Sequence, residues 1–416
     1  MTQDKKVITS WALFDFAMGS FSTIMVVSVF PIYFHEVIVR NGHGDAYWGV
    51  TTFASMLLVA LITPLLGAMA DVLNNKKLYL GVFAATVIIC SVGLYFVQPG
   101  MVLVAAILYL LANAGYEGGL VFYDAFLPEI TTPERFGRVS GFGYAIGYVG
   151  SLVMLLASIP FIMHGAKSET FLVTAADYLI FAIPLFLLVP EKRRQDVGNV
   201  AFSSLVKRGF SQLRATVKNI RHYPNITKFL IAYFIYNDGI LTVVTFSGIY
   251  SKQTLHFTDI DLAIFFIVIQ VVAVIGSLLF GKLSDKRGPK LAIQITLCLW
   301  IFVGIVAFFA ADKMTFYVVG LIAGLALGSC QSCSRSLMAR LTPRKHTAEF
   351  FGFYDGFAGR ASGILGPLIF GVLSELGGQR IAIITVSVFF IAGFFLIRRV
   401  NQGPVVSDET LVVETA

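Results

Sequence analysis

The sequence contains little charge. Lys, Arg, Asp and Glu make up 13% of its 416 residues, whereas they form about a quarter of an ordinary soluble domain. Apolar residues make up 57% of the chain, and the mean hydropathy is +0.80. This composition excludes an ordinary soluble globular protein and is typical of an integral membrane protein.

Cysteine and histidine are also scarce: the sequence has four cysteines and six histidines. All four cysteines, Cys90, Cys298, Cys330 and Cys333, lie in expected helices, so the sequence indicates no disulfide framework. The pair in "CQSC" has metal-like spacing, but it stands alone among small residues, so we expect no metal and no cofactor. The six histidines fall at helix ends or in loops. Carboxylates would therefore carry any proton, since a desolvated carboxyl group can titrate near neutral pH.

The sequence also lacks a glycine-rich phosphate loop, so ATP is not expected as the driving force and any transport would be secondary. A hydrocarbon core of about 30 Å requires about 20 apolar residues per helix. Twelve runs of that kind predict an all-α membrane protein with twelve transmembrane helices. They begin near Trp11, Tyr47, Leu78, Met101, Gly137, Phe171, Ile226, Asp259, Leu291, Met314, Glu349 and Arg380.

The first run extends to Phe34 without a small-residue cleavage site, so we expect a retained helix and not a signal peptide. Most of the 31 Lys and Arg residues fall on one side of the predicted membrane, with the largest group between Lys192 and Lys228. Because cytoplasmic loops carry the excess of Lys and Arg, both termini are predicted to be cytoplasmic. We expect a plasma membrane location, the inner membrane in a bacterium. The basic pI of 9.1 follows from this topology and does not require a nucleic-acid partner.

Two stretches of sequence occur twice at nearly the same offset. "GAMADVLNNKK" begins at Gly67 and "GKLSDKRGPK" at Gly281, 214 positions later; "FGRVSGF" begins at Phe136 and "FGFYDGF" at Phe351, 215 positions later. These repeats predict a six-helix unit duplicated in parallel, as in the two halves of the major facilitator fold.

The predicted domains are two six-helix bundles at 1–190 and 226–400, a cytoplasmic linker at 191–225, and a cytoplasmic tail at 401–416. In the linker, apolar residues recur every three or four positions, with Lys and Arg between them. Two interpretations remain open: an amphipathic helix along the inner membrane surface, or a solvated linker helix.

The repeated loop resembles the signature loop of the major facilitator superfamily. Its Gly permits close helix packing, its Asp is expected to meet the first turn of a neighbouring helix, and its Lys and Arg are expected to hold the cytoplasmic surface. The first copy departs from the pattern at Val72 and Asn74. The matching positions are Gly67, Asp71 and Lys76 in the first copy and Gly281, Asp285, Arg287, Gly288 and Lys290 in the second.

A closer resemblance rests on six strings between Trp11 and Gly371: "WALFDFAMGSF", "FYDAFLPEI", "SGFGYAIGYVG", "FIYNDGILTV", "SCSRSL" and "FFGFYDGFAGRASGILGPLIFG". Together they resemble the vacuole-effluxer (autophagy-related) branch of that superfamily and its bacterial relatives. The resemblance implies amino-acid export for the fungal members, without implying that substrate here. It also implies that the first, fourth, seventh and tenth runs line a central cavity and that the third, sixth, ninth and twelfth face lipid.

Ionisable residues inside membrane helices are costly and are functional candidates by default. Asp238 lies near the bilayer midplane, and none of the candidates falls in a run expected to face lipid. A structural interpretation stays open for each carboxylate, namely a bond to a nearby Tyr or Arg that locks helices together. The predicted substrate and proton pathway comprises Asp238, Glu117, Asp15, Arg360, Tyr236 and Tyr116, and the predicted gate comprises Asp124, Arg335 and Asp355.

The sequence therefore predicts a secondary active transporter, not an enzyme, that moves a small organic solute by alternating access with proton coupling. Carboxylates, arginines and tyrosines suit an amino acid or a similar zwitterion. The alternative is an exporter of cationic or amphiphilic drug-like compounds, and a lipid scramblase or a membrane sensor is less favoured. The expected partners are a small-molecule substrate, protons and membrane lipids, and the expected state is a monomer. Because "GILGPLIFG" lies in the eleventh run, it does not indicate antiport.

Overall fold

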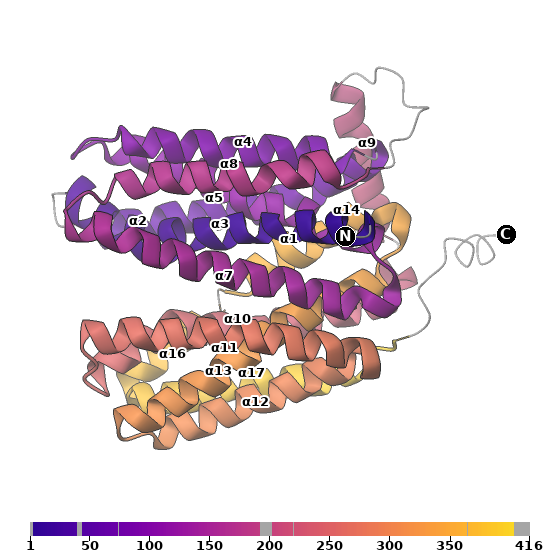
Figure 1. The fold of residues 1–416 in the computed structure, drawn as a ribbon. Coiled ribbons are helices and arrows are strands. Elements are labelled where there is room, and N and C mark those ends of the chain that lie inside the picture. The colour runs from indigo at the N-terminus through magenta and orange to yellow at the C-terminus, as the bar shows by residue number, and fades with distance from the viewer. Residues whose placement is uncertain are drawn as a thin grey trace. The chain divides into compact units, whose positions relative to one another are not determined.

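The structure is a computed structural model that describes residues 3–39, 44–73, 75–191, 202–218, 220–363 and 365–402. Asn74, part of the predicted linker and nearly all of the predicted tail lie outside these ranges. Every regular element within them is helical, and twelve helices are long and apolar enough to cross a membrane (Figure 1). The predicted all-α fold with twelve spans is therefore confirmed.

We number the spans 1 to 12 in chain order. Span 1 begins at Gln3 and not near Trp11, because its first turn of polar residues continues the helix with exposed side chains. The spans of the first half are α1 to η2 (Gln3–Phe21, Ser22–Ser28, Val29–Tyr33, Phe34–Ile38), α3 (Gly44–Leu73), α4 (Lys76–Tyr95), α5 with the short α6 (Val102–Asp124, Leu127–Ile130), α7 (Phe136–Met163) and α8 (Glu169–Leu188). Two parts of span 1, Ser22–Ser28 and Phe34–Ile38, are π-helical.

The linker contains α9 (Phe202–Lys218), and the second half repeats the order of the first. Its spans are α10 (Pro224–Gln253), α11 (Asp259–Arg287), α12 (Pro289–Phe309), α13 (Lys313–Leu341), the interrupted span 11 and α17 (Gln379–Arg398). Span 11 consists of α14 (Thr347–Phe351), a π-helical turn at Gly352–Ala358, α15 (Gly359–Ala361) and α16 (Leu365–Gly377). Sequence reasoning did not predict this interruption.

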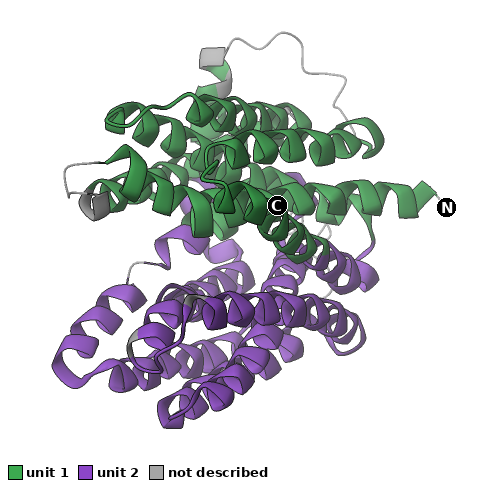
Figure 2. Cartoon of the chain, turned by 60° about the vertical axis from the view of Figure 1, so that its left-hand side comes forward, with its two compact units in different colours: residues 1–131, 146–214, 346–357 green, residues 132–145, 215–345, 358–416 purple. Residues whose placement is uncertain are grey.

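The chain forms two compact units (Figure 2). Unit 1 comprises residues 1–131, 146–214 and 346–357, and unit 2 comprises residues 132–145, 215–345 and 358–416. The units follow the two sequence halves except that each contains the beginning of a span from the other half. The start of span 5 packs in unit 2, and the start of span 11 packs in unit 1.

Glycines explain how the start of span 5 packs in unit 2. Gly137 and Gly141 of α7 lie against Gly281 and Ser277 of α11, and a Cβ at either position would collide with a backbone carbonyl of α11. The helices can therefore approach until their backbones touch, as small residues permit in membranes.

The start of span 11 packs in unit 1 in the equivalent way. Gly352 and Gly356 lie against Thr63 and Pro64 of α3, and a Cβ at Gly352 would come within 2.8 Å of the Pro64 Cα. By the sequence repeat, these two glycines correspond to those of span 5, so both copies use the same small-residue contact.

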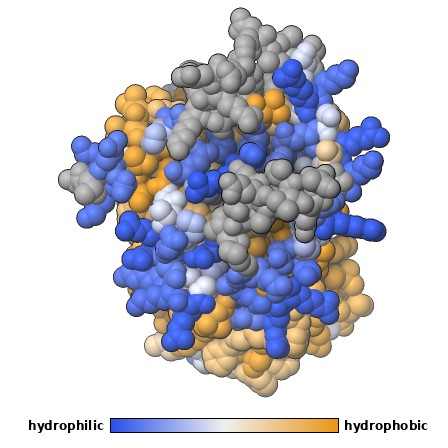
Figure 3. Space-filling view, turned by 90° about the vertical axis from the view of Figure 1, so that its right-hand side faces the viewer, coloured by the Kyte–Doolittle hydropathy of each residue, from blue (hydrophilic) through white to orange (hydrophobic). Residues whose placement is uncertain are grey.

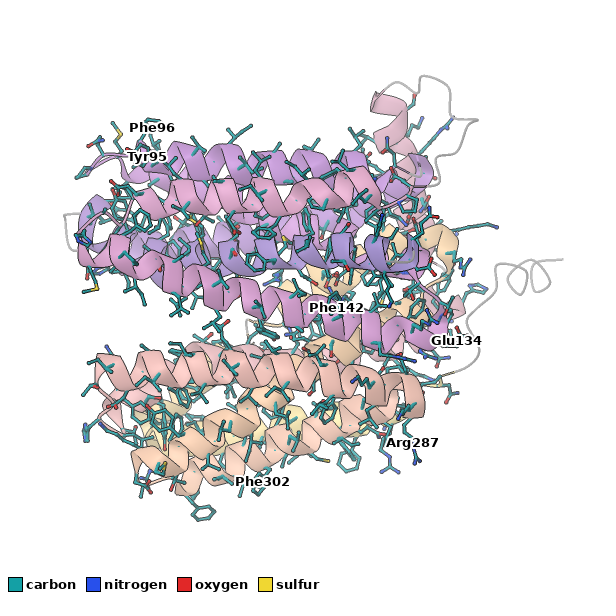
Figure 4. All side chains as sticks on the ribbon, viewed as in Figure 1. Tyr95, Phe96, Glu134, Phe142, Arg287 and Phe302 are labelled. Carbon is teal, nitrogen blue, oxygen red and sulfur yellow. The ribbon has the colours of Figure 1, made fainter. Side chains whose placement is uncertain are left out.

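Burial differs between the spans. In an apolar stretch of each, 61, 50, 50 and 56% of the residues are buried in spans 1, 4, 7 and 10, against 22 to 44% elsewhere. The spans expected to line a cavity are thus the most buried ones. Large apolar side chains are exposed on spans expected to face lipid, such as Phe302 of α12, which points away from its helix bundle (Figure 4). Hydrophilic residues gather on the face shown in Figure 3, at the side predicted to be cytoplasmic.

Candidate functional site

In unit 1, the Asp15 carboxylate joins span 1 to span 4. Its Oδ2 accepts a hydrogen bond of 2.6 Å from the hydroxyl of Tyr123. Trp11, one turn earlier, stacks on the same tyrosine ring at 4.6 Å and donates from Nε1 to its carbonyl at 3.0 Å. All three side chains are buried. This contact favours the structural interpretation of Asp15, and its predicted place in the pathway stays a prediction.

Glu117 continues a row of polar side chains on span 4. Tyr109, Asn113 and Glu117 follow at intervals of four residues, so they share one face of α5, and all three are buried. Asn113 Nδ2 donates to Ser55 Oγ of span 2 at 2.8 Å. Among the described residues, Asn113 Oδ1 has no hydrogen-bond partner. Sequence reasoning found Glu117 and missed the other two, although their spacing was visible.

The glycines around Glu117 orient the helix. A Cβ at Gly115 would lie 2.9 Å from the Phe83 carbonyl, and one at Gly118 would lie 2.7 Å from the Phe83 ring, so these glycines face span 3. At about 100° per residue, Glu117 then points away from span 3. The neighbouring Tyr116 stacks on Phe21 of span 1 at 5.1 Å.

In unit 2, Asn237 and Asp238 bind both sides of the interruption in span 11. The backbone N–H of Gly366, near the start of α16, donates to Oδ1 and Oδ2 of Asp238 at 2.9 and 3.0 Å. Asn237 Nδ2 donates to the carbonyl of Gly359 at 3.2 Å and to the hydroxyl of Ser362 at 2.8 Å. An interrupted helix leaves N–H and C=O groups that lipid cannot satisfy. The adjacent amide and carboxylate supply those partners.

This pair is tightly enclosed. The Asp238 side chain is fully buried, and a Cβ at Gly366 would lie 2.9 Å from its Oδ1. Thr242 donates to the Asp238 carbonyl at 2.7 Å. Arg360 directly follows Gly359, so the predicted substrate residue belongs to the short segment that Asn237 holds.

Arg335 of span 10 is fully buried, and its side chain packs against the start of span 5. Its Nε donates to Ser140 Oγ at 2.9 Å and its Nη2 to the Ser140 carbonyl at 2.8 Å, while its guanidinium lies 4.1 Å from the ring centre of Tyr144. Arg335 belongs to unit 2, whereas its predicted gate partners Asp124 and Asp355 belong to unit 1. Their pairing stays a prediction.

Tyr236, the last predicted pathway residue, joins two spans of unit 2. Its buried hydroxyl lies 2.7 Å from the hydroxyl of Ser334 in span 10. Ser334 directly precedes Arg335 in the sequence. The contact with Ser334 leaves Tyr236 a structural role and does not test its predicted role in the pathway.

Both signature-loop aspartates bind the start of a helix. Asp71 accepts hydrogen bonds from the backbone N–H groups of Ala348 and Glu349 in α14 at 3.0 and 2.8 Å. Asp285 accepts them from the backbone N–H groups of Gly137 and Arg138 in α7 at 2.7 and 3.2 Å, and from the Arg138 side chain at 2.7 Å. This is the contact that the sequence predicts for the loops. A carboxylate is favourable there, because the N-terminal end of a helix carries positive partial charge.

The basic residues of the loops have different roles. Lys76 is buried, and its Nζ forms an ion pair with the exposed Glu129 at the end of span 4. Its predicted role at the cytoplasmic surface stays a prediction. Lys290 donates to the carbonyls of Arg398 and Val400 at 2.7 Å each and so binds the end of span 12. Arg287 is exposed at the end of α11 (Figure 4). Gly288 follows with a φ of 89°, a value that favours glycine, and Gly67 packs on the backbone of α14.

Twelve spans in two repeats, each with a signature loop after its second span, define a major facilitator superfamily transporter. The protein is thus a multi-pass membrane protein and a secondary transporter, not an enzyme. The family model described as "Vacuole effluxer Atg22 like" matches residues 3–136 and 133–404, and the chain belongs to that family.

Relatives span nearly the whole chain. The uncharacterized MFS-type transporter YxiO of Bacillus subtilis (strain 168) is 31% identical over 97% of this chain and 96% of its own length. Autophagy-related protein 22 of Kluyveromyces lactis is 25% identical over 88% of this chain and 74% of its own length.

Two solved structures share the fold. The human organic anion transporter MFSD10 superimposes with a TM-score of 0.76 at 15% identity, covering 95% of this chain and all of that one. The proton:xylose symporter XylE reaches 0.76 at 15% identity and covers 99% of both chains. At such identities the likeness shows the fold alone.

Proposed function

We propose that this transporter moves a small zwitterionic solute, such as an amino acid, and couples its movement to protons by alternating access. The observation that carries the proposal is the pair Asn237 and Asp238, which binds both sides of the interruption in span 11. Arg360 lies in α15, on the side of the interruption that Asn237 binds. A proton site and a carboxylate-binding residue are thus held by one set of hydrogen bonds.

The proton acts on Asp238. When Asp238 is charged, both of its carboxylate oxygens accept from the N–H of Gly366. The negative charge is stabilised there by the positive partial charge at the N-terminal end of α16. Protonation removes that charge and converts one oxygen into a donor, which weakens the hold on α16. The segment that contains Arg360 then has freedom to shift.

The substrate acts on the segment that contains Arg360, by binding to the Arg360 side chain. A carboxylate that binds the Arg360 guanidinium in a bidentate manner fixes its direction and favours one arrangement of the interruption. Because linkage is reciprocal, a proton that changes carboxylate affinity is itself bound with an affinity that the substrate changes. Coupling therefore needs no contact between proton and substrate.

Glu117 provides the complementary charge in unit 1. Its carboxylate suits an ammonium group, and Tyr116 offers an aromatic face. Two of the comparisons agree with parts of this proposal: the family model is described as vacuole-effluxer-like, and XylE is named as a proton:xylose symporter. Neither name identifies the substrate of this chain.

The test starts with a thermal-shift screen of the purified protein against amino acids, betaines, peptides and cationic drugs, because a bound solute stabilises the fold. Proteoliposomes with an imposed pH gradient then measure uptake and exchange of each hit. We expect saturable uptake of a zwitterion that the gradient drives. Hits limited to cationic drugs would favour the exporter alternative, and no saturable flux for any hit would contradict the proposal.

A further inference from the structure

The linker helix α9 runs across the ends of the unit 1 helices and not along them (Figure 1). One of its faces packs on unit 1. At Gly209, a Cβ would lie 2.5 Å from Met69 Cγ of span 2, and Gln212 Nε2 donates to Glu349 Oε2 of span 11 at 2.7 Å. Glu349 is fully buried. The helix is therefore fixed to unit 1 through small and polar contacts.

A second face of α9 carries apolar side chains without cover. Phe210 and Val217 are 58 and 54% exposed. They are seven residues apart, so they point within about 20° of each other, and Phe210 is turned about 100° from Gly209. The sequence predicts one apolar face for this helix. The structure divides it, because Val206 and Leu213 turn partly inward.

Cations border the exposed apolar pair. Lys207, Arg214 and Lys218 are exposed, and helix geometry places them about 40° to 80° from Phe210 on the side away from unit 1. Among the described residues, none of the three forms an ion pair or a hydrogen bond. Apolar side chains bordered by cations on a helix that lies across the ends of membrane spans match the chemistry of an anionic lipid surface.

We propose that α9 is a lipid-binding element whose Phe210 and Val217 enter the interface of the adjacent leaflet while Lys207, Arg214 and Lys218 bind anionic phospholipid headgroups. The membrane is favoured over a soluble partner because the chain is a membrane protein whose α9 already lies at the ends of its spans. The proposal resolves the two interpretations of the linker in favour of the membrane surface. It does not depend on the substrate or on proton coupling.

The experiment places an environment-sensitive NBD fluorophore on each side of α9. Cys298 is the exposed one of the four cysteines, so the full chain with Cys298→Ser is the background. Phe210→Cys labels the proposed lipid face. Ala215→Cys is the matched control, because Ala215 is exposed on the other side of the helix, about 140° from Phe210. Both proteins are reconstituted in nanodiscs of phosphatidylcholine with or without phosphatidylglycerol.

We expect the label at position 210 to be blue-shifted and quenched several-fold more by doxyl-labelled phospholipid than the label at 215. The difference should grow with phosphatidylglycerol and fall in high salt. Replacing Lys207, Arg214 and Lys218 by Gln should remove the dependence on phosphatidylglycerol. Equal quenching at the two positions would overturn the proposal. Quenching at 210 that ignores phosphatidylglycerol, salt and the three substitutions would overturn the anionic-lipid assignment.

Discussion

Replacing Asp238 by Asn changes charge while keeping shape. The Asn carbonyl can still accept the hydrogen bond of the Gly366 N–H, which the wild-type carboxylate receives with both oxygens at 2.9 and 3.0 Å. What is lost is the negative charge at the start of α16. The variant therefore resembles the protonated carboxyl group and holds the interruption of span 11 in its loosened form.

The size of the effect follows from that geometry. Losing a charge beside a helix N-terminus costs about 0.3 to 2 kcal/mol. Asp238→Ala in addition leaves the buried N–H of Gly366 without an acceptor, at a further cost of about 1 to 3 kcal/mol. Thermal stability should thus fall in the order wild type, Asp238→Asn, Asp238→Ala. Glu375→Gln is the matched control, because Glu375 is an exposed carboxylate on α16, the helix that Asp238 binds. This substitution should leave thermal stability unchanged.

Transport should separate the two roles of the site. We expect Asp238→Asn to bind substrate and to exchange it across proteoliposomes, since neither step requires net proton movement. Accumulation driven by a pH gradient should be lost, because the residue no longer takes up and releases a proton. If the variant accumulates substrate as well as wild type under the same gradient, Asp238 only holds span 11 and the proton travels elsewhere.

Three further predictions concern other contacts. Arg360→Lys should weaken binding of a carboxylate substrate strongly in a thermal-shift titration, because the bidentate fork is lost, while a decarboxylated analogue should bind both proteins equally; full affinity in the variant would make Arg360 structural. Reversal of charge at Asp124 or at Arg335 should abolish uptake and reversal at both should restore it, and a double variant as inactive as the singles would contradict their pairing. Gly141→Ala should lower the melting temperature, because its Cβ meets a backbone carbonyl of α11, whereas Gly371→Ala should not, since nothing lies within 4 Å of a Cβ there; equal melting would contradict the close-packing argument.

Features that follow from composition and repetition could be predicted from the sequence. The spans are visible because a bilayer imposes a minimum apolar length, and the helix contacts of Asp71 and Asp285 follow from a loop motif that occurs twice. The interruption of span 11 could not be predicted. Its glycines indicate close packing, which Gly352 confirms, but nothing local distinguishes them from Gly366, whose N–H needs a partner from span 7.

Contacts between residues far apart in the sequence could not be predicted either. The sequence places Lys76 in a basic loop without indicating that its side chain is buried and paired with Glu129, because only the fold brings the two residues together. The sequence did not predict the role of Asn237, because only its ionisable neighbour Asp238 is marked as a functional candidate by the cost of burying a charge in a membrane. The side-chain NH2 of Asn237 can donate to a backbone carbonyl on one side of the interruption, just as the carboxylate of Asp238 can accept from a backbone N–H on the other side.

The duplicated loops also show that repeated sequence need not keep the same supports. In unit 2, the contact of Asp285 with the start of span 5 is reinforced by Arg138. The repeat places Phe353 at the equivalent position of span 11, so Arg138 has no counterpart there, and the positive charge that acts on Asp71 in unit 1 is that of Lys76. The first turn of span 11 is instead bound by Gln212 of α9. A helix outside the repeat thus adds support to the start of span 11, because Gln212 contacts both His346 and Glu349 there. Since the neighbouring face of α9 is the proposed lipid-binding one, a change in its lipid contact would reach the start of span 11 through Gln212.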